Sequence, residues 1–275
     1  MSAAQGLLRA RLTTQCGSSR SPAVWFLRSP DWASLTERVG ELIRKPEEIP
    51  ADALLKRAPR RLVFLCQAGL AQHPLIVVKV FPLSRLRDRL RHKRYAYNET
   101  VNLLTAADLG LPVPGVLGYG LCRQMGLTRW NALLLQFLQG RPLREHLAGA
   151  DALTQRNLLW RVLPLFQKIY QAGCNHIDLG PHAIFLGDTN GARDCLIDFQ
   201  YCRFLEKPDP RTLAAQAGYF GWCLTTYWNL APASLVTEWF ETLLDKLSLT
   251  DRSALGEIFR RRLLKRASIR ERLAQ

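Results

Sequence analysis

Two aspartates, each directly after a short apolar run, constrain this chain most. Asp178 lies in His176-Ile177-Asp178-Leu179-Gly180-Pro181-His182, and Asp198 follows Leu196-Ile197 twenty residues later, a separation that accommodates a loop and a β-hairpin. In kinases a catalytic-loop aspartate orients the acceptor hydroxyl and takes its proton, and a second aspartate binds the Mg²⁺ that bridges the nucleotide phosphates. The pair therefore predicts a phosphotransferase, with Asp178 as general base and Asp198 as metal ligand.

A single lysine interrupts an apolar run upstream of these aspartates. The run Leu75–Phe81 predicts a buried strand, and its Lys79 needs an anionic partner. Glu99 is the candidate, because it lies in a segment, 95–104, whose apolar residues recur at helical spacing. Kinases brace a strand lysine, which binds the α- and β-phosphates, with such a helix glutamate. The alternative is that Lys79 snorkels from a half-buried strand and that Glu99 and both aspartates have structural roles.

From about Leu54 to Phe204 the chain resembles the lipopolysaccharide kinases of Gram-negative bacteria, which phosphorylate Kdo and heptose sugars. The residues that carry this resemblance are Val78-Lys79-Val80-Phe81, Glu99, Gly110-Leu111-Pro112-Val113-Pro114, Gly118-Tyr119-Gly120, His176-Ile177-Asp178 and Ile197-Asp198. Aminoglycoside and choline-type kinases share much of this pattern. The resemblance implies ATP and Mg²⁺ as cofactors and an α+β, bilobal protein-kinase-like fold.

The same resemblance divides the chain into three parts. Residues 1–53 are an N-terminal extension, 54–138 a small antiparallel-sheet N-lobe, and 139–275 a mostly helical C-lobe that ends in a basic amphipathic helix. The apolar run before Gly140 predicts a strand and a hinge, where backbone groups from Gln136 to Leu138 would meet the adenine edge. A plain core strand with a glycine turn has the same sequence pattern.

Two departures from the kinase pattern bear on activity. The predicted hairpin 54–64 has no glycine at its turn, where kinases carry a Gly-rich loop; its basic residues either contact phosphate through charge or form a solvated tip. Ala183 stands where kinases place a second Mg²⁺ ligand, and His182 is one position early. His182 either takes the metal role or makes a structural hydrogen bond, since Mg²⁺ prefers oxygen ligands. We group His176 with the catalytic residues as a support beneath their loop.

The C-lobe segments have clear periodicities. Residues 154–172 predict a helix that ends at Gly173, and 184–186 with 195–197 predict a hairpin that leads into Asp198. Only helices are predicted from Pro210 onward, with five aromatic residues assigned to the core in preference to a substrate cleft: Trp222, Tyr227, Trp228, Trp239 and Phe240. The lack of an A-P-E signature after Asp198 favours a small-molecule or glycolipid acceptor over a peptide.

The charge of the chain points to an anionic partner. Lysine and arginine total 38 against 23 acidic residues, a net charge of +15. One basic cluster spans 85–94, and another spans 260–272 beside an apolar stripe of Leu255, Phe259, Leu263 and Ala267. A basic amphipathic helix suits an anionic membrane surface, although a solvated face is the usual alternative. Nucleic acid is an unlikely partner, since no basic-aromatic interleaving and no finger-type Cys/His spacing occur.

Seven cysteines without a C-x-x-C pair predict free thiols in a reducing compartment. The first 30 residues lack a secretory apolar block but are basic and Ser-rich, so a mitochondrial transit peptide is compositionally possible, though a frayed bacterial N-terminus is preferred.

We predict a kinase that phosphorylates a Kdo or heptose hydroxyl of the lipopolysaccharide inner core, or a similar anionic glycolipid. It would lie in the cytoplasm, peripheral to the inner membrane. The alternatives are a soluble small-molecule kinase and a catalytically silent pseudokinase.

Overall fold

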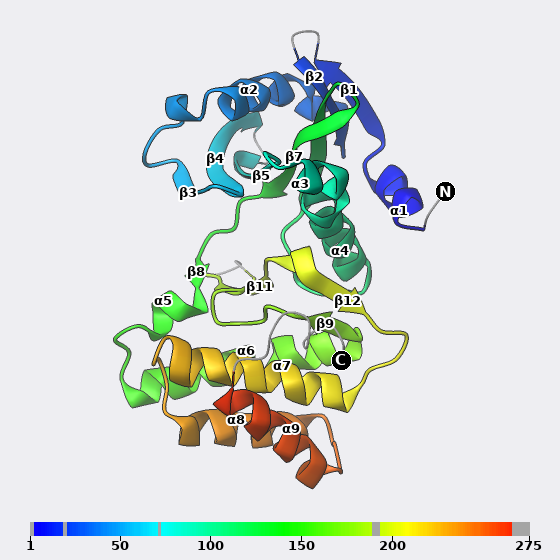
Figure 1. Ribbon diagram of the computed structural model, residues 1–275. Coiled ribbons are helices and arrows are strands. Elements are labelled where there is room, and N and C mark those ends of the chain that lie inside the picture. The colour runs from blue at the N-terminus through cyan, green and yellow to red at the C-terminus, as the bar shows by residue number, and fades with distance from the viewer. Residues whose placement is uncertain (1–2, 19–20, 71–72, 189–192, 266–275) are drawn as a thin grey trace. The chain divides into compact units, whose positions relative to one another are not determined.

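The computed structural model describes residues 3–18, 21–70, 73–188 and 193–265 (Figure 1). The chain forms two compact units. Unit 1 comprises Met1–Thr105 and Pro114–Phe137, and unit 2 comprises Ala106–Val113 and Leu138–Gln275. Among the helices described, none has the length and apolar content needed to cross a membrane.

Unit 1 is built on a sheet that, in the described residues, has seven antiparallel strands in the order β1-β2-β6-β7-β5-β4-β3. The predicted hairpin at 54–64 and the predicted strand at Leu75–Phe81 are both present. Two strands come from the N-terminal extension, and β2 pairs with β6. The strands are β1 Thr14–Ser18, β2 Ser21–Leu27, β3 Leu54–Ala58, β4 Arg61–Leu70, β5 His73–Pro82, β6 Val116–Gln124 and β7 Leu127–Gln136.

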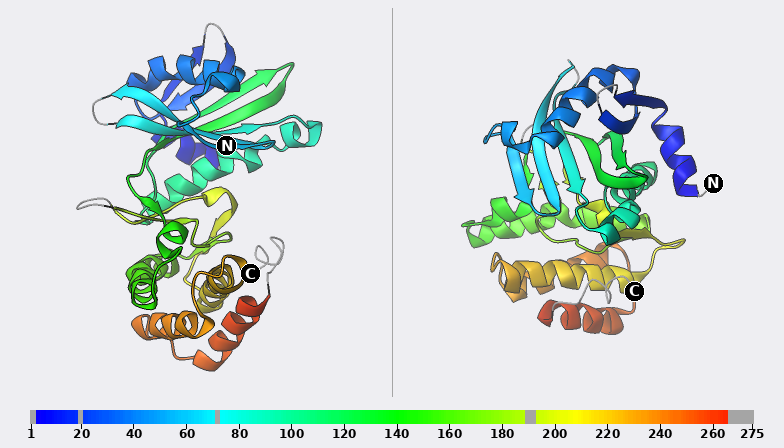
Figure 2. Two further views of the ribbon diagram at one scale, coloured as in Figure 1. Left: turned by 90° about the vertical axis from the view of Figure 1, so that its left-hand side faces the viewer. Right: turned by 45° about the horizontal axis from the view of Figure 1, so that its top comes forward.

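Helices cover both faces of this sheet, as the left view of Figure 2 shows for α2 and α4. Because side chains alternate along a strand, β5 sends Ile76, Val78 and Val80 to the core beneath α2 and sends Lys79 to the α4 face. The helices of unit 1 are α1 Ala3–Arg11, α2 Ala33–Arg44, α3 Leu86–Leu90 and α4 Ala96–Asp108, with short 3-10 turns at Pro30–Trp32, Pro46–Glu48 and His92–Arg94.

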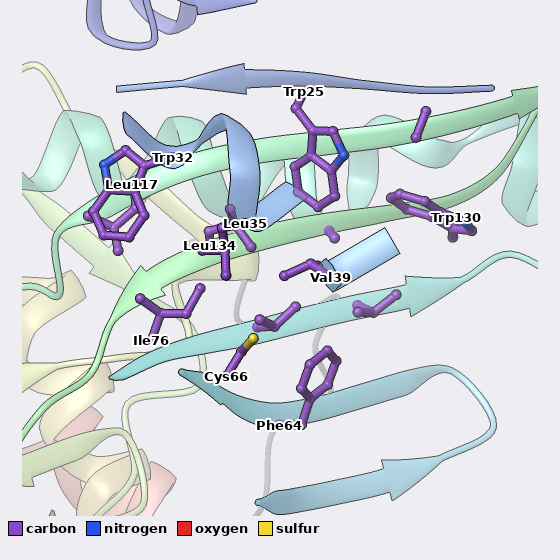
Figure 3. Packing of buried hydrophobic residues seen from close by; sticks show 14 of the residues in the cluster. Trp25, Trp32, Leu35, Val39, Phe64, Cys66, Ile76, Leu117, Trp130 and Leu134 are labelled. Atoms are coloured by element: carbon purple, nitrogen blue, oxygen red, sulfur yellow. The ribbon is translucent and has the colours of Figure 1, made fainter. Parts of the chain in front are cut away.

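The core of unit 1 explains the Gly118-Tyr119-Gly120 motif. Trp25 is fully buried, and its ring lies 5.8 Å from that of Trp130 (Figure 3). Trp25 pairs with Gly120 across β2 and β6, and a Cβ on Gly120 would overlap the indole. A Cβ on Gly118 would lie 2.7 Å from Leu27 Cδ2. Both glycines therefore admit large side chains from the N-terminal strand.

Unit 2 is mostly helical. The predicted helix at 154–172 is α6, whose first turn is capped by Asp151 accepting from Thr154 N at 2.7 Å. It stops at Gly173, which has a φ of 59°, a conformation suited to glycine. The helical elements are α5 Leu143–Leu147, α6 Ala152–Gln171, α7 Pro210–Trp222, a π-helix at Cys223–Tyr227 labelled η5, α8 Ala233–Lys246 and α9 Arg252–Leu264.

Short strands of unit 2 lie above these helices in Figure 1. The predicted hairpin before Asp198 is present, since β10 pairs with β11 and Ile184 faces Leu196; the turn residues 189–192 are outside the described part. A second pair, β9 with β12, frames the segment that leads to Asp178. The strands are β8 Arg141–Pro142, β9 Cys174–His176, β10 Ile184–Leu186, β11 Cys195–Leu196 and β12 Cys202–Phe204, with a 3-10 turn at Phe199–Tyr201.

The apolar stripe predicted for the C-terminal helix is buried inside unit 2. Leu255, Phe259 and Leu263 are at most 8% exposed, and α9 packs on α7 so closely that a Cβ on Gly218 would lie 2.6 Å from Phe259 O. The expectation that this stripe would face a membrane is therefore wrong for α9, because a neighbouring helix already covers it. Ala267, Arg270 and Arg272, also assigned to this tail, lie outside the described residues.

No disulfide joins any of the seven cysteines, all of which lie within the described residues. Cys174 and Cys202 approach each other, with 3.3 Å between their Sγ atoms on β9 and β12. Burial raises the pKa of the Cys202 thiol, followed in effect by the contact with Cys174. A thiol kept protonated in this way is a poor nucleophile, since the thiolate is the reactive form.

Candidate active site

In unit 1, Lys79 on β5 and Glu99 on α4 form the predicted pair. Lys79 Nζ lies 2.6 Å from Glu99 Oε1, and the residues are 5% and 0% exposed. The alternatives of a snorkelling lysine and a solvated glutamate are therefore wrong. Strand β5 places Lys79 on the sheet face that α4 covers, so the ammonium is presented to the first turn of that helix.

The surroundings of this pair hold the ammonium in one position. Lys79 Nζ also lies 5.9 Å from the ring centroid of Phe81, two residues along the same face of β5, a distance at which a ring attracts a cation. Two charges taken out of water seldom stabilise a fold by themselves. A buried pair of this kind is instead suited to fixing a cation where an anionic ligand, such as a phosphate, can be bound.

One backbone group of the predicted hinge is already bonded within unit 1. Gln136 ends β7, and its backbone N–H donates to Gly115 O at 2.9 Å while its Oε1 accepts from Gly115 N at 3.3 Å. That backbone donor is therefore already used and cannot serve an adenine edge. Leu138 is half-buried and lies outside the regular strands, and its contact with a nucleotide stays a prediction.

At the tip of the β3–β4 hairpin the basic side chains are solvent-accessible. Lys56, Arg57 and Arg60 are exposed, and the Arg61 guanidinium lies 5.4 Å from the Phe81 ring centroid. Phe81 is therefore flanked by Arg61 as well as by Lys79. The exposure suits both interpretations of the hairpin, phosphate contact and solvated tip.

In unit 2, Asp178 lies on a series of tight turns directly after β9. Leu179 N donates to His176 O at 3.2 Å, Gly180 N donates to Asp178 O at 2.8 Å, and Ala183 N donates to Gly180 O at 2.9 Å. These hydrogen bonds fix the backbone of the loop. Asp178 itself is half-buried, so it stays accessible to solvent. A carboxylate held on a rigid, accessible loop is suited to taking a proton from a bound hydroxyl.

His176 links this loop to the segment that carries Asp198. Its ring is 1% exposed, and Nε2 lies 2.9 Å from Ile197 O, which it can reach only as a donor. Its backbone N–H donates to Gln216 Oε1 at 3.2 Å. Burial lowers the pKa of His176, against the opposing hydrogen bond to Ile197 and the charges of Asp178 and Asp198. The imidazole is therefore neutral near pH 7, as a support and not a proton carrier.

Asp198 has an unusual backbone. Its φ of 64° and ψ of 48° are left-handed, a conformation that costs a non-glycine residue roughly 1–3 kcal/mol and that clusters at functional sites. On its N-terminal side, Ile197 N donates to Ala183 O at 2.9 Å. The residue before Asp198 is thus hydrogen-bonded to the loop that carries Asp178. The left-handed backbone at Asp198 changes the direction of the chain shortly after β11 ends.

His182 lies against Gly180 and Trp228. A Cβ on Gly180 would lie 2.8 Å from His182 Nδ1, so only glycine leaves room for the ring, and the ring centroids of His182 and Trp228 are 5.3 Å apart. In the described part of the chain Nδ1 is buried without a hydrogen-bond partner. Burial lowers the pKa of His182, and the charges of Asp198 and Asp178 act in the opposite direction.

These groups fit Mg²⁺ through their oxygen donors. Asp198 and Asp178 supply the hard carboxylate ligands that Mg²⁺ prefers, whereas the His182 imidazole suits softer metals. Among the described residues no three His, Cys, Asp or Glu side chains converge as a preformed metal centre, and Ala183 is fully buried without a donor side chain. Metal binding by His182 therefore stays a prediction.

The assignment of five aromatic residues to the core holds for only some of them. Trp239 and Phe240 are fully buried, as predicted, but Tyr227 is 57% exposed and Trp222 and Trp228 are half-buried. The three that are not fully buried lie close together in the sequence, between positions 222 and 228. Composition alone does not separate a core ring from an exposed one.

Comparisons with known proteins agree with the resemblance drawn from the motifs. Residues 83–211 match the model of the lipopolysaccharide kinase (Kdo/WaaP) family. The match contains Glu99, His176, Asp178, His182 and Asp198 and begins just after Lys79. No curated protein matches the chain significantly.

Among solved structures, WaaP in complex with acyl carrier protein matches with a TM-score of 0.58 and 13% identity, covering 87% of this chain and 98% of WaaP. The bifunctional kinase-methyltransferase WbdD matches with a TM-score of 0.46 and 17% identity, covering 75% of this chain and 48% of that one. The likeness to WaaP confirms the predicted α+β kinase-like fold, and the match over residues 83–211 confirms the predicted resemblance to the lipopolysaccharide kinases.

Proposed function

We propose, from the relation of this chain to the lipopolysaccharide kinase (Kdo/WaaP) family, that it transfers the γ-phosphoryl group of ATP to a Kdo or heptose hydroxyl of the lipopolysaccharide inner core. The observation that carries the proposal is the buried 2.6 Å ion pair of Lys79 and Glu99. Such a pair contributes little stability for its desolvation cost, so its presence on a kinase-like sheet favours a role in binding phosphate.

Each proposed catalytic residue has one task. Lys79, held by Glu99, binds the α- and β-phosphates. Asp178 orients the sugar hydroxyl and accepts its proton as the hydroxyl oxygen bonds to the γ-phosphorus and the bond to the β–γ bridging oxygen breaks. The products are the sugar phosphate and ADP. Mg²⁺, when bound, neutralises charge on the phosphate oxygens, and Asp198 is the residue that would hold it.

His176 is proposed to position the loop of Asp178. Its Nε2–H bonds Ile197 O at 2.9 Å, one residue before Asp198, and its backbone is bonded to Gln216. Because the ring is buried and neutral, it adds no charge between the two carboxylates. These bonds would therefore hold the loop of Asp178 in a fixed position relative to the turn that carries Asp198.

A catalytically silent protein is the second candidate, favoured by Ala183. This residue is 0% exposed and has no donor atom at the position of the second metal ligand. A pseudokinase of this kind would bind a nucleotide or sugar without phosphoryl transfer. A soluble small-molecule kinase would differ from the proposed lipopolysaccharide kinase only in its acceptor. Assays that compare acceptor substrates distinguish the two.

Peripheral attachment to an anionic membrane is part of the proposal, but the surface differs from the one first predicted. On α9 the apolar stripe is covered, and the exposed residues near its end are Arg260, Arg261 and Leu264, the last at 81%. On α3, Leu86 and Leu90 are 60% and 66% exposed. They share one side of the helix, being four residues apart. We define the α3 surface as Leu86 and Leu90 together with three exposed arginines, Arg85, Arg87 and Arg91.

The α3 surface has both components of interfacial binding. Exposed leucines insert into the boundary of head groups and acyl chains, and each nearby basic residue adds about 1 kcal/mol of attraction to anionic lipid. The acid of this segment, Asp88, accepts a hydrogen bond from Tyr95 Oη at 2.7 Å. The surface would hold the kinase close to a glycolipid acceptor.

Core oligosaccharides from cells that lack this chain test the function. Mass spectrometry should show the loss of one phosphate, restored by the wild-type chain and not by Asp178→Asn. An unchanged phosphate pattern in the deleted strain would contradict the lipopolysaccharide acceptor. Equal restoration by both versions would contradict phosphoryl transfer through Asp178 and favour the silent protein.

A further inference from the structure

Aromatic rings form a continuous series that starts at the loop of Asp178. The ring centroid of His182 lies 5.3 Å from Trp228, Trp228 lies 4.6 Å from Tyr227, and Tyr227 lies 5.4 Å from Trp222. Trp222 in turn stacks on Tyr219 at 6.0 Å. All five residues belong to unit 2. We call Trp222, Tyr227 and Trp228 the aromatic platform.

The platform is not part of the core of unit 2. That core has its own aromatic cluster, in which the fully buried rings of Phe166, Phe220 and Trp239 lie 4.7–5.1 Å apart. Tyr227, by contrast, is 57% exposed. Its ring is nevertheless ordered by near-parallel stacking on Trp222, with an interplanar angle of 29°. A large ring that stays exposed to water gains no stabilisation from burial. Exposed aromatic surface that is held in one orientation is typical of a ligand-binding site.

A π-helix brings these rings to the surface. In η5, Trp228 N donates to Cys223 O at 3.1 Å, a bond to the fifth residue back. One such turn changes the direction of every following side chain relative to an α-helix, and π-helical turns occur frequently at functional sites. The turn ends at Asn229, whose φ of 51° is left-handed. Tyr227 and Trp228 therefore owe their orientation to this irregular turn.

Both ends of the π-helix lie on the candidate catalytic loop. At its start, a Cβ on Gly180 would lie 3.2 Å from Cys223 Sγ, so the glycine lets η5 approach the loop. Just past its end, Trp228 contacts His182. His182 is also subject to the charges of Asp178 and Asp198. The platform is thus attached to the loop whose aspartate is proposed to activate the acceptor.

We propose that the aromatic platform binds the acceptor sugar by contact with the apolar C–H face of a pyranose ring. The negative face of an aromatic ring attracts such weakly positive C–H groups. Tyr227 supplies the exposed contact face, and Trp222 and Trp228 fix its orientation. This inference rests on the proposed function and names where in unit 2 its acceptor binds.

The test compares Tyr227→Ala with Tyr227→Phe, which keeps the ring. Trp160→Ala is the matched control, because Trp160 is a half-buried aromatic residue of α6 that carries the Arg156 guanidinium 4.4 Å from its ring and is not part of the series. With deacylated inner-core oligosaccharide as acceptor, Tyr227→Ala should raise its KM about tenfold, equal to ~1.4 kcal/mol. The KM for ATP and kcat should stay within twofold, as should every constant of Tyr227→Phe and Trp160→Ala.

A binding measurement separates this inference from the proposed function. Tryptophan fluorescence is titrated with the same oligosaccharide without nucleotide, and then with ATP and Mg²⁺ alone. A sugar-dependent change that Tyr227→Ala removes supports the platform, even if no phosphate is transferred. Transfer with unchanged KM and unchanged sugar binding in Tyr227→Ala would overturn the platform and leave the kinase. A Tyr227-dependent response to ATP alone, or no response to either ligand, would also overturn it.

Discussion

Lys79 Nζ and Glu99 Oε1 lie 2.6 Å apart between β5 and α4, and the two residues are almost fully buried. Breaking a buried ion pair from one side strands the other charge, which costs about 3–5 kcal/mol. Lys79→Met should therefore lower the free energy of unfolding by that amount in urea titration. Lys79→Met combined with Glu99→Leu should recover most of it, because no buried charge remains. A single variant as stable as the wild type would contradict burial of the pair.

Nucleotide binding gives a second test of Lys79. A ligand that binds only the native state stabilises it by mass action, by about 2.7 kcal/mol at one hundred times its Kd. ATP with Mg²⁺ should raise the Tm of the wild type, and Lys79→Met should not respond, each compared with its own ligand-free Tm. Absence of any shift in the wild type at millimolar ATP would contradict the ATP-dependent reaction.

Asp178→Asn separates catalysis from binding. The amide keeps the shape of the side chain but cannot accept the hydroxyl proton, and a general base typically contributes about 10²–10⁴ in rate. Phosphate transfer should fall by that factor, while the Tm and its rise with ATP stay near those of the wild type. Transfer at an undiminished rate would assign the proton to another group.

The pH dependence of stability should report His176. Burial lowers its pKa below the ordinary 6.5, so the folded protein keeps the ring neutral while the unfolded chain protonates it. The unfolded state then binds more protons, and the free energy of unfolding falls as the pH drops below about 6.5. His182 and His92, whose pKa values burial also lowers, act in the same direction. His176→Asn should show a smaller fall in Tm between about pH 7 and 5.5; an equal fall would contradict this assignment.

Packing of α7 on α9 can be tested with two glycines. A Cβ on Gly218 would lie 2.6 Å from both Phe259 O and Arg262 Cβ, so Gly218→Ala should destabilise the fold by about 1–3 kcal/mol through overpacking. Gly256→Ala on α9 is the control, since its nearest foreign atom is Arg260 Nη2 at 3.9 Å. That change should stabilise the helix by roughly 0.5–1 kcal/mol. Urea unfolding of both variants measures the difference, and equal effects would contradict the close approach.

Membrane attachment should depend on α3 more than on α9. The α3 surface combines two exposed leucines with three arginines, whereas α9 has one exposed leucine, Leu264, beside its basic residues. Changing Arg85, Arg87 and Arg91 to Glu should abolish co-sedimentation with anionic liposomes in low salt, because the Debye length of about 10 Å at 0.1 M leaves surface attraction intact. Changing Leu86 and Leu90 to Ser should weaken binding at low and high salt alike.

The matched control for this experiment changes Arg260, Arg261 and Lys265, all exposed near the end of α9, to Glu. It alters the net charge equally but leaves the two leucines of the α3 surface beside their arginines, so binding should weaken less. Equal loss of liposome binding in the two charge variants would mean that binding depends only on the net charge of the protein. Loss confined to the α9 variant would place the membrane-binding surface on the C-terminal helix instead.

Several features were determined by the sequence itself, because they depend on neighbouring residues. The apolar run around Lys79 and the helical spacing around Glu99 are local patterns, and each produced the predicted element. The same holds for the β10–β11 hairpin before Asp198. The order of lysine, glutamate and two aspartates along the chain was enough to predict a kinase, and the family resemblance drawn from these and neighbouring motifs agrees with the model matched over 83–211.

Contacts between distant segments decided the rest. Strands β1 and β2 join the sheet because Trp25 fits over Gly120, nearly one hundred positions away, and no local pattern announces that pairing. The stripe on α9 had the right period for a membrane helix, but period does not say what covers an apolar face, and α7 does so through Gly218. The π-helix likewise packs on a distant loop, since a Cβ on Gly180 would lie 3.2 Å from Cys223 Sγ. Side-chain period is a property of a single segment, whereas burial is a property of what packs against it, and only the tertiary structure supplies that second element.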